Sequence, residues 1–397
     1  MDIHEYQAKQ LLKSNGINVP AGKIAYTALE AQNVAREISP RGPWVLKAQI
    51  HSGSRNSGRF VERRAGKGGG IRIVKTLKEV YDNAAQMLGS TLITAQNKPD
   101  GNLVSRIYVE AYTKVEQIFY LSMAIDRTYP AITVLAANTE TDDIAAILAN
   151  SPEKIIRVPL DLKGPTKAHC KRIAEFLNLK AKSFESFYHF VRGLFKTFVK
   201  SEALMVEINP VGILRNGDIV ALDAKITIDN RAVYRHKDIS SFRDEDDIPP
   251  RELKAARNGF SYHEYGNGNI GCIVNGSGLA LAMVGMLKGS AACTLNIKGG
   301  VDRDKIAAGI KIIATNPRVE GIVINILGGF VRCDLISDGI IDTAAEVGMN
   351  MPLVVRFEGT NRDEACKILE QANLPLIMAD SMDDAIAKVL KAVEESE

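Results

Sequence analysis

The chain has 397 residues, 46% of them hydrophobic and 24% charged, so its length and composition predict two or three domains with sizeable hydrophobic cores. Its 50 basic and 47 acidic residues leave a formal net charge of only +3, which gives no reason to expect nucleic acid or an anionic membrane as a partner. Five scattered cysteines without a C-x-x-C pair argue against a disulfide framework, and the N-terminus shows no export or import signal, so we expect a cytoplasmic protein.

Helix and strand patterns alternate in the first part of the chain. Apolar spacing predicts a helix over 4–14 that ends at Asn15-Gly16. Capping-box patterns that begin at Thr27 and Thr76 each predict a helix start after an apolar strand. The expected strands are 23–26, 44–50, 71–74, 106–110, 118–125 and 131–136, and further helices are expected near 167–179 and 185–200.

A hairpin is predicted over 204–228, where two strand patterns flank a turn. A two-residue turn at Asn216-Gly217 would mix polar and apolar side chains on both faces. A three-residue loop, 215–217, with Gly217 in the left-handed conformation separates the faces cleanly. Because a one-residue slip would move every core residue to the wrong side, we expect the three-residue loop.

In this register Asn209 lies opposite Asp223, and Glu207 lies opposite Lys225, on a polar face that also carries Thr227. The predicted core face holds Val206, Ile208, Val220, Leu222, Ile226 and Ile228. A carboxylate and an amide oxygen on paired residues, with Cβ atoms about 5 Å apart, suit a shared hard cation such as Mg²⁺ on a nucleotide. The alternative is a polar face exposed to solvent.

Lys47 lies near the end of a predicted strand and precedes a loop that contains Gly53. A lysine in this position can neutralise nucleotide phosphates, although surface lysines beside loops are common. The basic residues of 56–67 could close over the same phosphates, or the segment could be a solvated loop.

The second part of the chain follows an acidic, proline-containing connector at 244–250, and we expect the domain boundary between 243 and 266. Strands predicted at 270–274, 321–326 and 353–357 are each followed by a glycine-bearing turn and a helix pattern. This repetition is typical of a doubly wound parallel sheet, in which such turns gather at one ligand-binding edge.

Several motifs together resemble the beta subunit of succinyl-CoA synthetase, a succinate–CoA ligase that forms ADP or GDP, from end to end. They are His4–Lys9, Gly42–Val45, Glu207–Pro210, Gly268–Cys272, Val274–Gly276 and Val331–Asp334. The resemblance implies an α/β chain with an ATP-grasp domain over 1–245, followed by a flavodoxin-like, doubly wound parallel-sheet domain over 246–397. It also implies an enzyme that reversibly forms succinyl-CoA from succinate, CoA and ATP or GTP.

The same resemblance implies a partner and a set of site residues. The partner is an alpha subunit that binds most of the CoA and carries a phosphohistidine, in an alpha-beta heterodimer or an alpha2-beta2 heterotetramer. Nucleotide contacts would come from Lys47, Ser54, Arg55, Glu110 and Thr113. Asn209 and Asp223 would hold Mg²⁺, and Glu207 would hydrogen-bond the partner's histidine. The acid and phosphate site would use Asn275, Gly329, Phe330 and Val331.

Three departures from the family pattern bear on the reaction. The glycine loop is interrupted by an insertion, Asn56–Ala65, a second acidic nucleotide contact is replaced by Ile118, and Lys298 adds a charge near the phosphate edge. These changes leave open the choice between ATP and GTP and the choice of acid. The alternatives are therefore the beta subunit of a malate–CoA ligase and a catalytically reduced scaffold for the alpha subunit.

Overall fold

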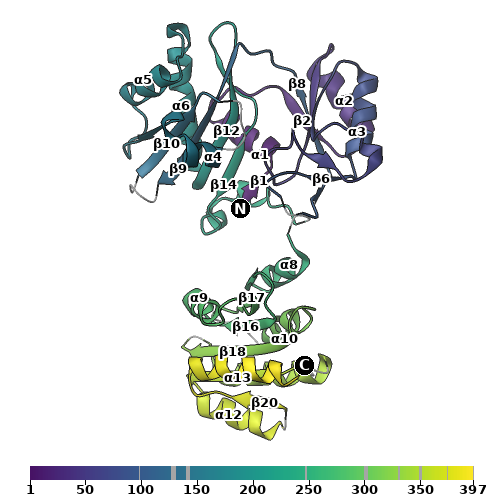
Figure 1. Cartoon of the computed structure of the whole chain (residues 1–397), viewed down its shortest axis with the longest axis vertical. Coiled ribbons are helices and arrows are strands. Elements are labelled where there is room, and N and C mark those ends of the chain that lie inside the picture. The colour runs from purple at the N-terminus through teal and green to yellow at the C-terminus, as the bar shows by residue number, and fades with distance from the viewer. Residues whose placement is uncertain are drawn as a thin grey trace. The chain divides into compact units, whose positions relative to one another are not determined.

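The computed structural model describes residues 1–97, 99–126, 131–139, 144–245, 248–298, 303–329, 331–347, 351–372 and 374–396. They form two compact units, Met1–Arg243 and Asp244–Glu397, here called the N-terminal and C-terminal units (Figure 1). Each buried hydrophobic cluster of the described residues lies within one unit, as expected for separate domains. Of the helices in the described residues, none has the length and apolar run that a membrane crossing requires.

The N-terminal unit is built on antiparallel sheets. Its strands are β1 (Asp2–Ile3), β2 (Gly22–Ala25), β3 (Trp44–Ala48), β4 (Arg59–Phe60), β5 (Ile71–Val74), β6 (Thr91–Ile93), β7 (Asn102–Leu103), β8 (Ile107–Ala111), β9 (Gln117–Asp126), β10 (Ala131–Ala137), β11 (Ile155–Pro159), β12 (Ala203–Ile213), β13 (Ile219–Ala221) and β14 (Lys225–Ile228). A seven-stranded sheet runs β1-β14-β12-β9-β10-β11 with β13 paired to β12, a four-stranded sheet runs β2-β8-β3-β5, and a small sheet runs β4-β6-β7. Each strand that was predicted here is present, with ends that differ by at most two residues.

Helices cover these sheets. They are α1 (Glu5–Ser14), α2 (Ala28–Ile38), α3 (Leu77–Met87), α4 (Ile144–Asn150), α5 (Lys167–Phe176), α6 (Phe184–Lys200) and α7 (Lys237–Ser240). The predicted caps are confirmed, because the Thr27 and Thr76 side chains accept hydrogen bonds from the backbone N–H groups three residues later. The helix predicted over 167–179 ends at Phe176, because Asn178 takes a left-handed conformation with a φ of 53°.

The hairpin has the predicted register. Glu207 pairs with Lys225, and Gly217 in the three-residue loop has a φ of 96°. One assignment to the core face is wrong: Leu222 is only half-buried and lines a pocket. The reason is an interruption between β13 and β14, where the Leu222 carbonyl turns to accept hydrogen bonds from Lys9 and Lys47.

The C-terminal unit has one six-stranded sheet. Its strands are β15 (Ser261–Glu264), β16 (Ile270–Val274), β17 (Ala291–Asn296), β18 (Gly321–Gly328), β19 (Leu353–Gly359) and β20 (Leu376–Met378). The order is β15-β17-β16-β18-β19-β20, in which β15 is antiparallel and the other pairs are parallel. Numbered along the chain, the parallel strands lie in the order 2-1-3-4-5, which is the flavodoxin-like arrangement. The predicted doubly wound sheet is confirmed.

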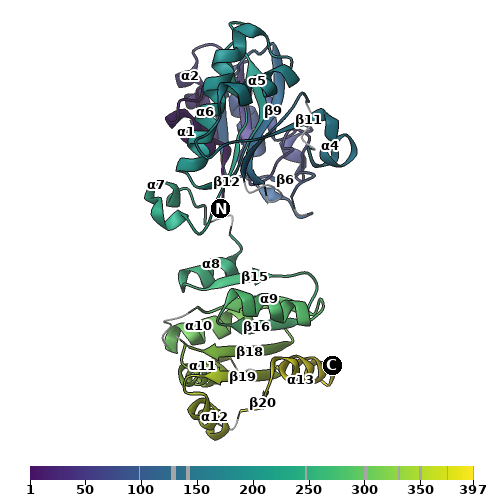
Figure 2. The same ribbon diagram turned by 90° about the vertical axis from the view of Figure 1, so that its left-hand side faces the viewer.

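Helices lie on both faces of this sheet (Figure 2). They are α8 (Pro250–Arg257), α9 (Ser277–Met286), α10 (Arg303–Ala314), α11 (Cys333–Val347), α12 (Arg362–Gln371) and α13 (Met382–Glu394). One hydrophobic cluster joins α9 and α13 to one face, and a second joins α10, α11 and α12 to the other. The strand order reverses between β16 and β18, where α/β sheets of this kind bind their ligands.

Candidate functional site

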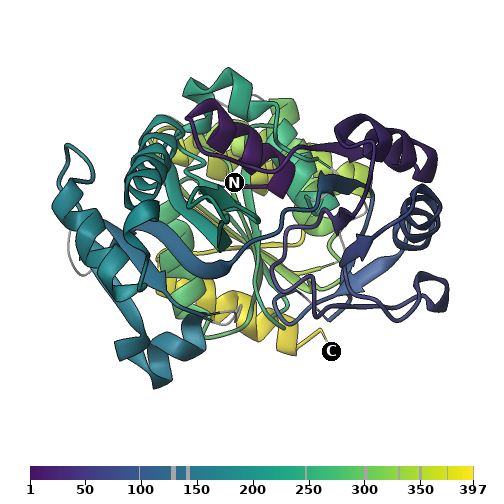
Figure 3. The same cartoon turned by 90° about the horizontal axis from the view of Figure 1, so that it is seen from above.

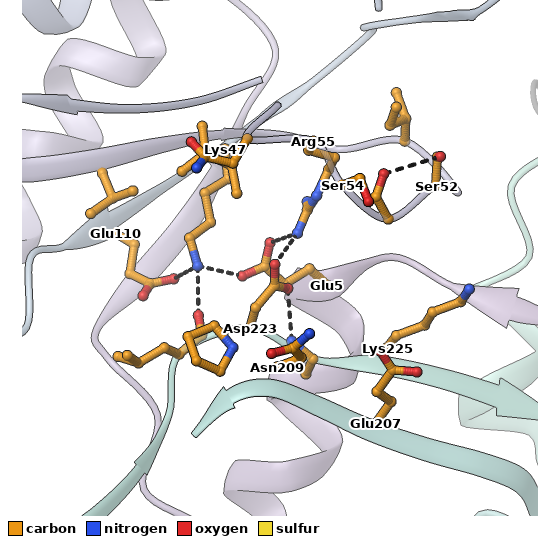
Figure 4. Close-up of a pocket in the computed structure, with 18 of the residues that line it drawn as sticks. Glu5, Lys47, Ser52, Ser54, Arg55, Glu110, Glu207, Asn209, Asp223 and Lys225 are labelled. Carbon is orange, nitrogen blue, oxygen red and sulfur yellow. Dashed lines mark hydrogen bonds and ion pairs between the residues drawn. The ribbon is translucent and has the colours of Figure 1, made fainter. Parts of the chain in front are cut away.

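A cavity of about 630 Å³ lies in the N-terminal unit between the seven-stranded and four-stranded sheets (Figure 4). Its walls come from β3, β5 and β8 on one side, from the hairpin on the other, and from the loop 50–56. In two perpendicular views, helix α1 lies between the part of the unit that holds the seven-stranded sheet and the part that holds the four-stranded sheet (Figures 1 and 3). This cavity, here called the interlayer pocket, has the volume of a site for a nucleotide-sized ligand.

Six ionisable side chains, five of which line the pocket, form what we call the charge cluster. They are Glu5, Lys9, Lys47, Arg55, Glu110 and Asp223. Five of them are less than a tenth exposed, and Asp223 is 22% exposed. The formal charges of the three cations and the three carboxylates sum to zero. The cluster is therefore electrically balanced without a ligand.

Lys47 projects from β3 into this cluster. Its Nζ lies 2.7 Å from Glu5 Oε1 and 3.3 Å from Glu110 Oε2, and it donates to the Leu222 carbonyl at 2.6 Å. Lys9 of α1 reaches the same carbonyl at 2.7 Å and also pairs with Glu110. The Leu222 carbonyl at the hairpin interruption thus accepts a hydrogen bond from each of these two ammonium groups and helps to hold them in position.

Arg55 joins the loop 50–56 to both sheets. Its Nη2 donates to Glu5 Oε2 at 2.7 Å and to Asp223 Oδ2 at 2.6 Å, and its Nη1 donates to the Ala48 carbonyl at 2.9 Å. The guanidinium is thereby held at the floor of the pocket.

The cluster shifts the pKa values of its members. Burial alone would raise the pKa of Glu5, but Lys47, Lys9 and Arg55 outweigh burial and hold that pKa well below its ordinary value. Burial alone would lower the pKa values of Lys47 and Arg55, and the neighbouring carboxylates raise both instead. All three groups are therefore charged at neutral pH.

Glu207, Asn209 and Asp223 line the same pocket (Figure 4). A shift in the pairing of β12 with β9 falls between Ile208 and Val211, beside Asn209, and such irregularities commonly re-aim side chains at active sites. The amide oxygen of Asn209 and the carboxylate of Asp223 are hard donors that fit Mg²⁺. Among the described residues no group of three or more His, Cys, Asp or Glu could hold a metal, so nucleotide phosphates and water would have to supply the other ligands.

Ser54 and Thr113 also line the pocket, so all five predicted nucleotide residues lie at one cavity. Arg55, which directly precedes the predicted insertion, is part of the charge cluster. The Arg55 carbonyl accepts a hydrogen bond from the Gly70 N–H at 2.8 Å, so residues 56–69 form a loop whose ends meet. Part of that loop, β4, pairs with β6 in the small sheet. Ile118 is not among the residues that line the pocket, and it pairs with Gly212 on β12.

Sequence reasoning missed Glu5 and Lys9. Both lie on the buried side of α1 with Ala8 and Leu12, at positions i, i+3, i+4 and i+7 of one helical stripe. Charged residues in an apolar stripe are almost never fully buried unless they are paired. The position of these two charged residues in an apolar stripe was the sequence feature that could have indicated a buried ion pair.

The predicted acid and phosphate residues lie at the carboxyl edge of the C-terminal sheet. The Asn275 side chain, after β16, donates to the Leu327 carbonyl at 2.6 Å and accepts from the Leu327 N–H at 2.9 Å. It therefore joins the two strands at the point where the strand order reverses. Gly329 follows at the same edge, Phe330 lies outside the described residues, and Val331 is 4% exposed within the core, so its side chain is not available to a ligand.

Comparison with known proteins assigns both units to families. An ATP-grasp domain model matches residues 2–213, and a CoA-ligase model matches residues 273–390. The chain is 43% identical to the succinate–CoA ligase (ADP-forming) subunit beta of Rhodospirillum rubrum and 42% identical to that of Acidiphilium cryptum, in both cases over the whole of both chains. An ATP citrate lyase from Methanothrix soehngenii, solved with citrate and coenzyme A, shares the fold with a TM-score of 0.73 at 14% identity, over 98% of this chain and 99% of that chain. Sequence identity over the full length and the order of the two domains show that this chain belongs to the family of succinate–CoA ligase beta subunits.

Proposed function

We propose that the chain is the nucleotide-binding beta subunit of an acid–CoA ligase that reversibly forms succinyl-CoA from succinate, CoA and ATP or GTP. Residues 1–245 would bind the nucleotide, and residues 246–397 would share the acid and CoA site with the alpha subunit. The observation that carries this proposal is that two buried cations of the charge cluster, Lys47 and Arg55, line the same pocket as Asn209 and Asp223, whose side chains supply oxygen ligands.

Different side chains of the pocket would have different roles in phosphoryl transfer. Lys47 and Arg55 would leave their carboxylate partners and bind nucleotide phosphate oxygens, so that positive charge lies where negative charge develops. Asn209 and Asp223 would hold Mg²⁺, which neutralises phosphate charge when it is bound. Asp223 would have to exchange its ion pair with Arg55 for that role.

Glu207 would act at the rim of the pocket. It pairs with Lys225 across the hairpin and lines the pocket beside Asn209 (Figure 4). We propose that its carboxylate accepts a hydrogen bond from the active histidine of the alpha subunit. A fixed carboxylate orients the imidazole and stabilises its positive charge while the phosphoryl group is transferred.

The position of the insertion supports an active enzyme over a catalytically reduced scaffold. Arg55 stays in the charge cluster, because residues 56–69 are closed off by the hydrogen bond from Gly70.

Five free cysteines support a reducing, cytoplasmic location. The partner would be an alpha subunit in an alpha-beta heterodimer or an alpha2-beta2 heterotetramer.

The proposal is tested by copurifying the chain with its cognate alpha subunit and measuring nucleotide-dependent thioester formation with succinate and with malate. We expect turnover with succinate, whereas turnover with malate alone would identify a malate–CoA ligase. Glu207→Gln should slow phosphorylation of the alpha subunit by about 10²-fold or more while assembly is unchanged. Glu185→Gln, which changes an exposed glutamate of α6, is the matched control.

No turnover with either acid would remove the proposed activity. Phosphorylation at the normal rate in Glu207→Gln would leave the ligase intact and show that Glu207 has another role.

A further inference from the structure

Glu5 is the carboxylate that contacts all three cations of the charge cluster. Its Oε1 lies 2.7 Å from Lys47 Nζ and 3.0 Å from Lys9 Nζ, and its Oε2 lies 2.7 Å from Arg55 Nη2. Gln49 also donates to Oε2, at 3.4 Å. With a side chain 2% exposed, Glu5 presents both oxygens to donors and none to solvent.

The contacts of Glu5 are the contacts that a phosphate group would make. A carboxylate and a phosphate recognise ammonium and guanidinium groups through the same charge-assisted hydrogen bonds. Lys47 and Arg55 line the interlayer pocket and would turn to the nucleotide in the proposed function. They cannot give Glu5 and the phosphates their full set of hydrogen bonds at once.

We propose that Glu5 is an internal counter-ion: it holds Lys47 and Arg55 in place in the nucleotide-free protein, yields them to the phosphates, and so weakens nucleotide binding. This inference rests on the proposed function of the interlayer pocket. Glu5 would then be a positioning residue that sets the affinity of the site for the phosphate part of the nucleotide. Weaker binding favours nucleotide release, which a reversible reaction requires.

Lys9 makes the exchange possible. A buried carboxylate that lost every cation would be strongly destabilised. Lys9 remains within 3.0 Å of Glu5, is itself held by Glu110 and by the Leu222 carbonyl, and has a side chain that is only 2% exposed. Glu5, Lys9 and Glu110 can thus stay paired while Lys47 and Arg55 move.

The other two carboxylates do not fit this role. Asp223 belongs to the oxygen pair proposed for Mg²⁺ and contacts only Arg55 among the cations of the cluster. Glu110 contacts Lys47 and Lys9 but has no ion pair with Arg55 in the cluster. Only the position of Glu5 on the first turn of α1 brings it between Lys47 and Arg55.

Glu5→Gln tests the proposal, because it keeps the size of the side chain and removes the competing charge. Titration calorimetry on the alpha-beta complex should show MgADP binding about tenfold tighter than in the wild type, an effect of one charged hydrogen bond. Binding of adenosine, measured by competition, should not change, since adenosine carries no phosphate. Glu37→Gln, at an exposed glutamate paired with Lys23, is the matched control.

Each result decides between two claims. Tighter MgADP binding with unchanged adenosine binding supports the counter-ion role. Unchanged or weaker MgADP binding in a folded Glu5→Gln complex overturns it, whereas a wild type that binds no MgADP would instead remove the proposed nucleotide site. If Glu5→Gln does not fold, Glu5→Asp decides, because it keeps the charge but withdraws the carboxylate from Lys47. MgADP should then bind about two- to fivefold tighter, and equal or weaker binding would overturn the proposal.

Discussion

The interlayer pocket and the carboxyl edge of the C-terminal sheet are built in opposite ways. The pocket depends on charged side chains that are buried and paired, such as Lys47 with Glu5. The edge depends on the backbone, where Asn275 binds the N–H and the carbonyl of Leu327 and Gly359 closely approaches Gly328. A charged pocket can exchange internal ion pairs for a ligand, whereas a backbone edge keeps one shape and presents it. The two regions should therefore respond to different substitutions.

Removal of a pocket cation should have the largest effect. Lys47→Met should weaken MgADP binding by about 100-fold or more, because a buried ammonium that would bind phosphate is lost, and Glu5 and Glu110 are left with fewer cations. Calorimetry on the alpha-beta complex measures this, and Lys171→Met at an exposed lysine is the control. An affinity within threefold of the wild type would show that Lys47 does not bind the phosphates.

A methyl group at the edge should have the next largest effect. Gly359 has a φ of 92°, and a Cβ there would lie 2.1 Å from the Gly328 carbonyl oxygen. Gly359→Ala should destabilise the protein by more than about 1 kcal/mol, measured by urea unfolding. Gly278→Ala, where a Cβ meets nothing within 4 Å, should have little effect. Equal stability of the two variants would contradict a rigid backbone edge.

Loss of the Asn275 side-chain amide should have the third largest effect. Asn275→Ala removes two hydrogen bonds to the backbone N–H and carbonyl of Leu327, which are exposed and would bind water instead, at a cost of about 0.5–1.5 kcal/mol. We expect thioester formation to fall while MgADP affinity is unchanged, because the edge lies in the C-terminal unit. A fall in MgADP affinity would show that the two sites are not independent. Asn258→Ala, at a half-buried asparagine of the same unit whose side chain donates to the Lys254 carbonyl, is the control.

The smallest effect concerns pH. Burial raises the pKa of Glu5, but its cations outweigh burial and hold it well below the ordinary value of 4.5. As the pH falls below about 4.5, the unfolded chain takes up the proton first, so the stability contributed by Glu5 is present above that pH and is lost as the pH falls toward the folded pKa. The unfolding free energies of wild type and Glu5→Gln in urea should therefore converge as the pH falls from 6 toward the lowest pH at which both proteins fold. Curves that stay parallel would contradict a depressed pKa.

The sequence predicts the parts of both regions that depend on local pattern. Period-two alternation and Gly217 were enough to set the hairpin register that brings Glu207 opposite Lys225, and the spacing of strands and glycine turns indicated the doubly wound sheet. These features follow from neighbours along the chain. The position of Leu222 did not follow, because a strand interruption turned its carbonyl to two lysines from distant segments.

The pairing inside the charge cluster could not be predicted from pattern. Arg55 and Asp223 are 168 residues apart along the chain, and Lys9 and Glu110 are 101 apart. No periodicity relates such positions, so only the packing of the two sheets reveals the pairs. Asn275 was predicted at the right edge, but its use as a strand link depends on a backbone group 52 residues away.

The central claim is that Asn209 and Asp223 hold the metal of a nucleotide whose phosphates bind Lys47 and Arg55. An anomalous difference map from crystals of the alpha-beta complex with MnADP tests this most directly. We expect a manganese peak between the Asn209 and Asp223 side-chain oxygens, with Arg55 moved from Asp223 to a phosphate. A peak elsewhere, with the Arg55–Asp223 ion pair intact beside a bound nucleotide, would contradict the account.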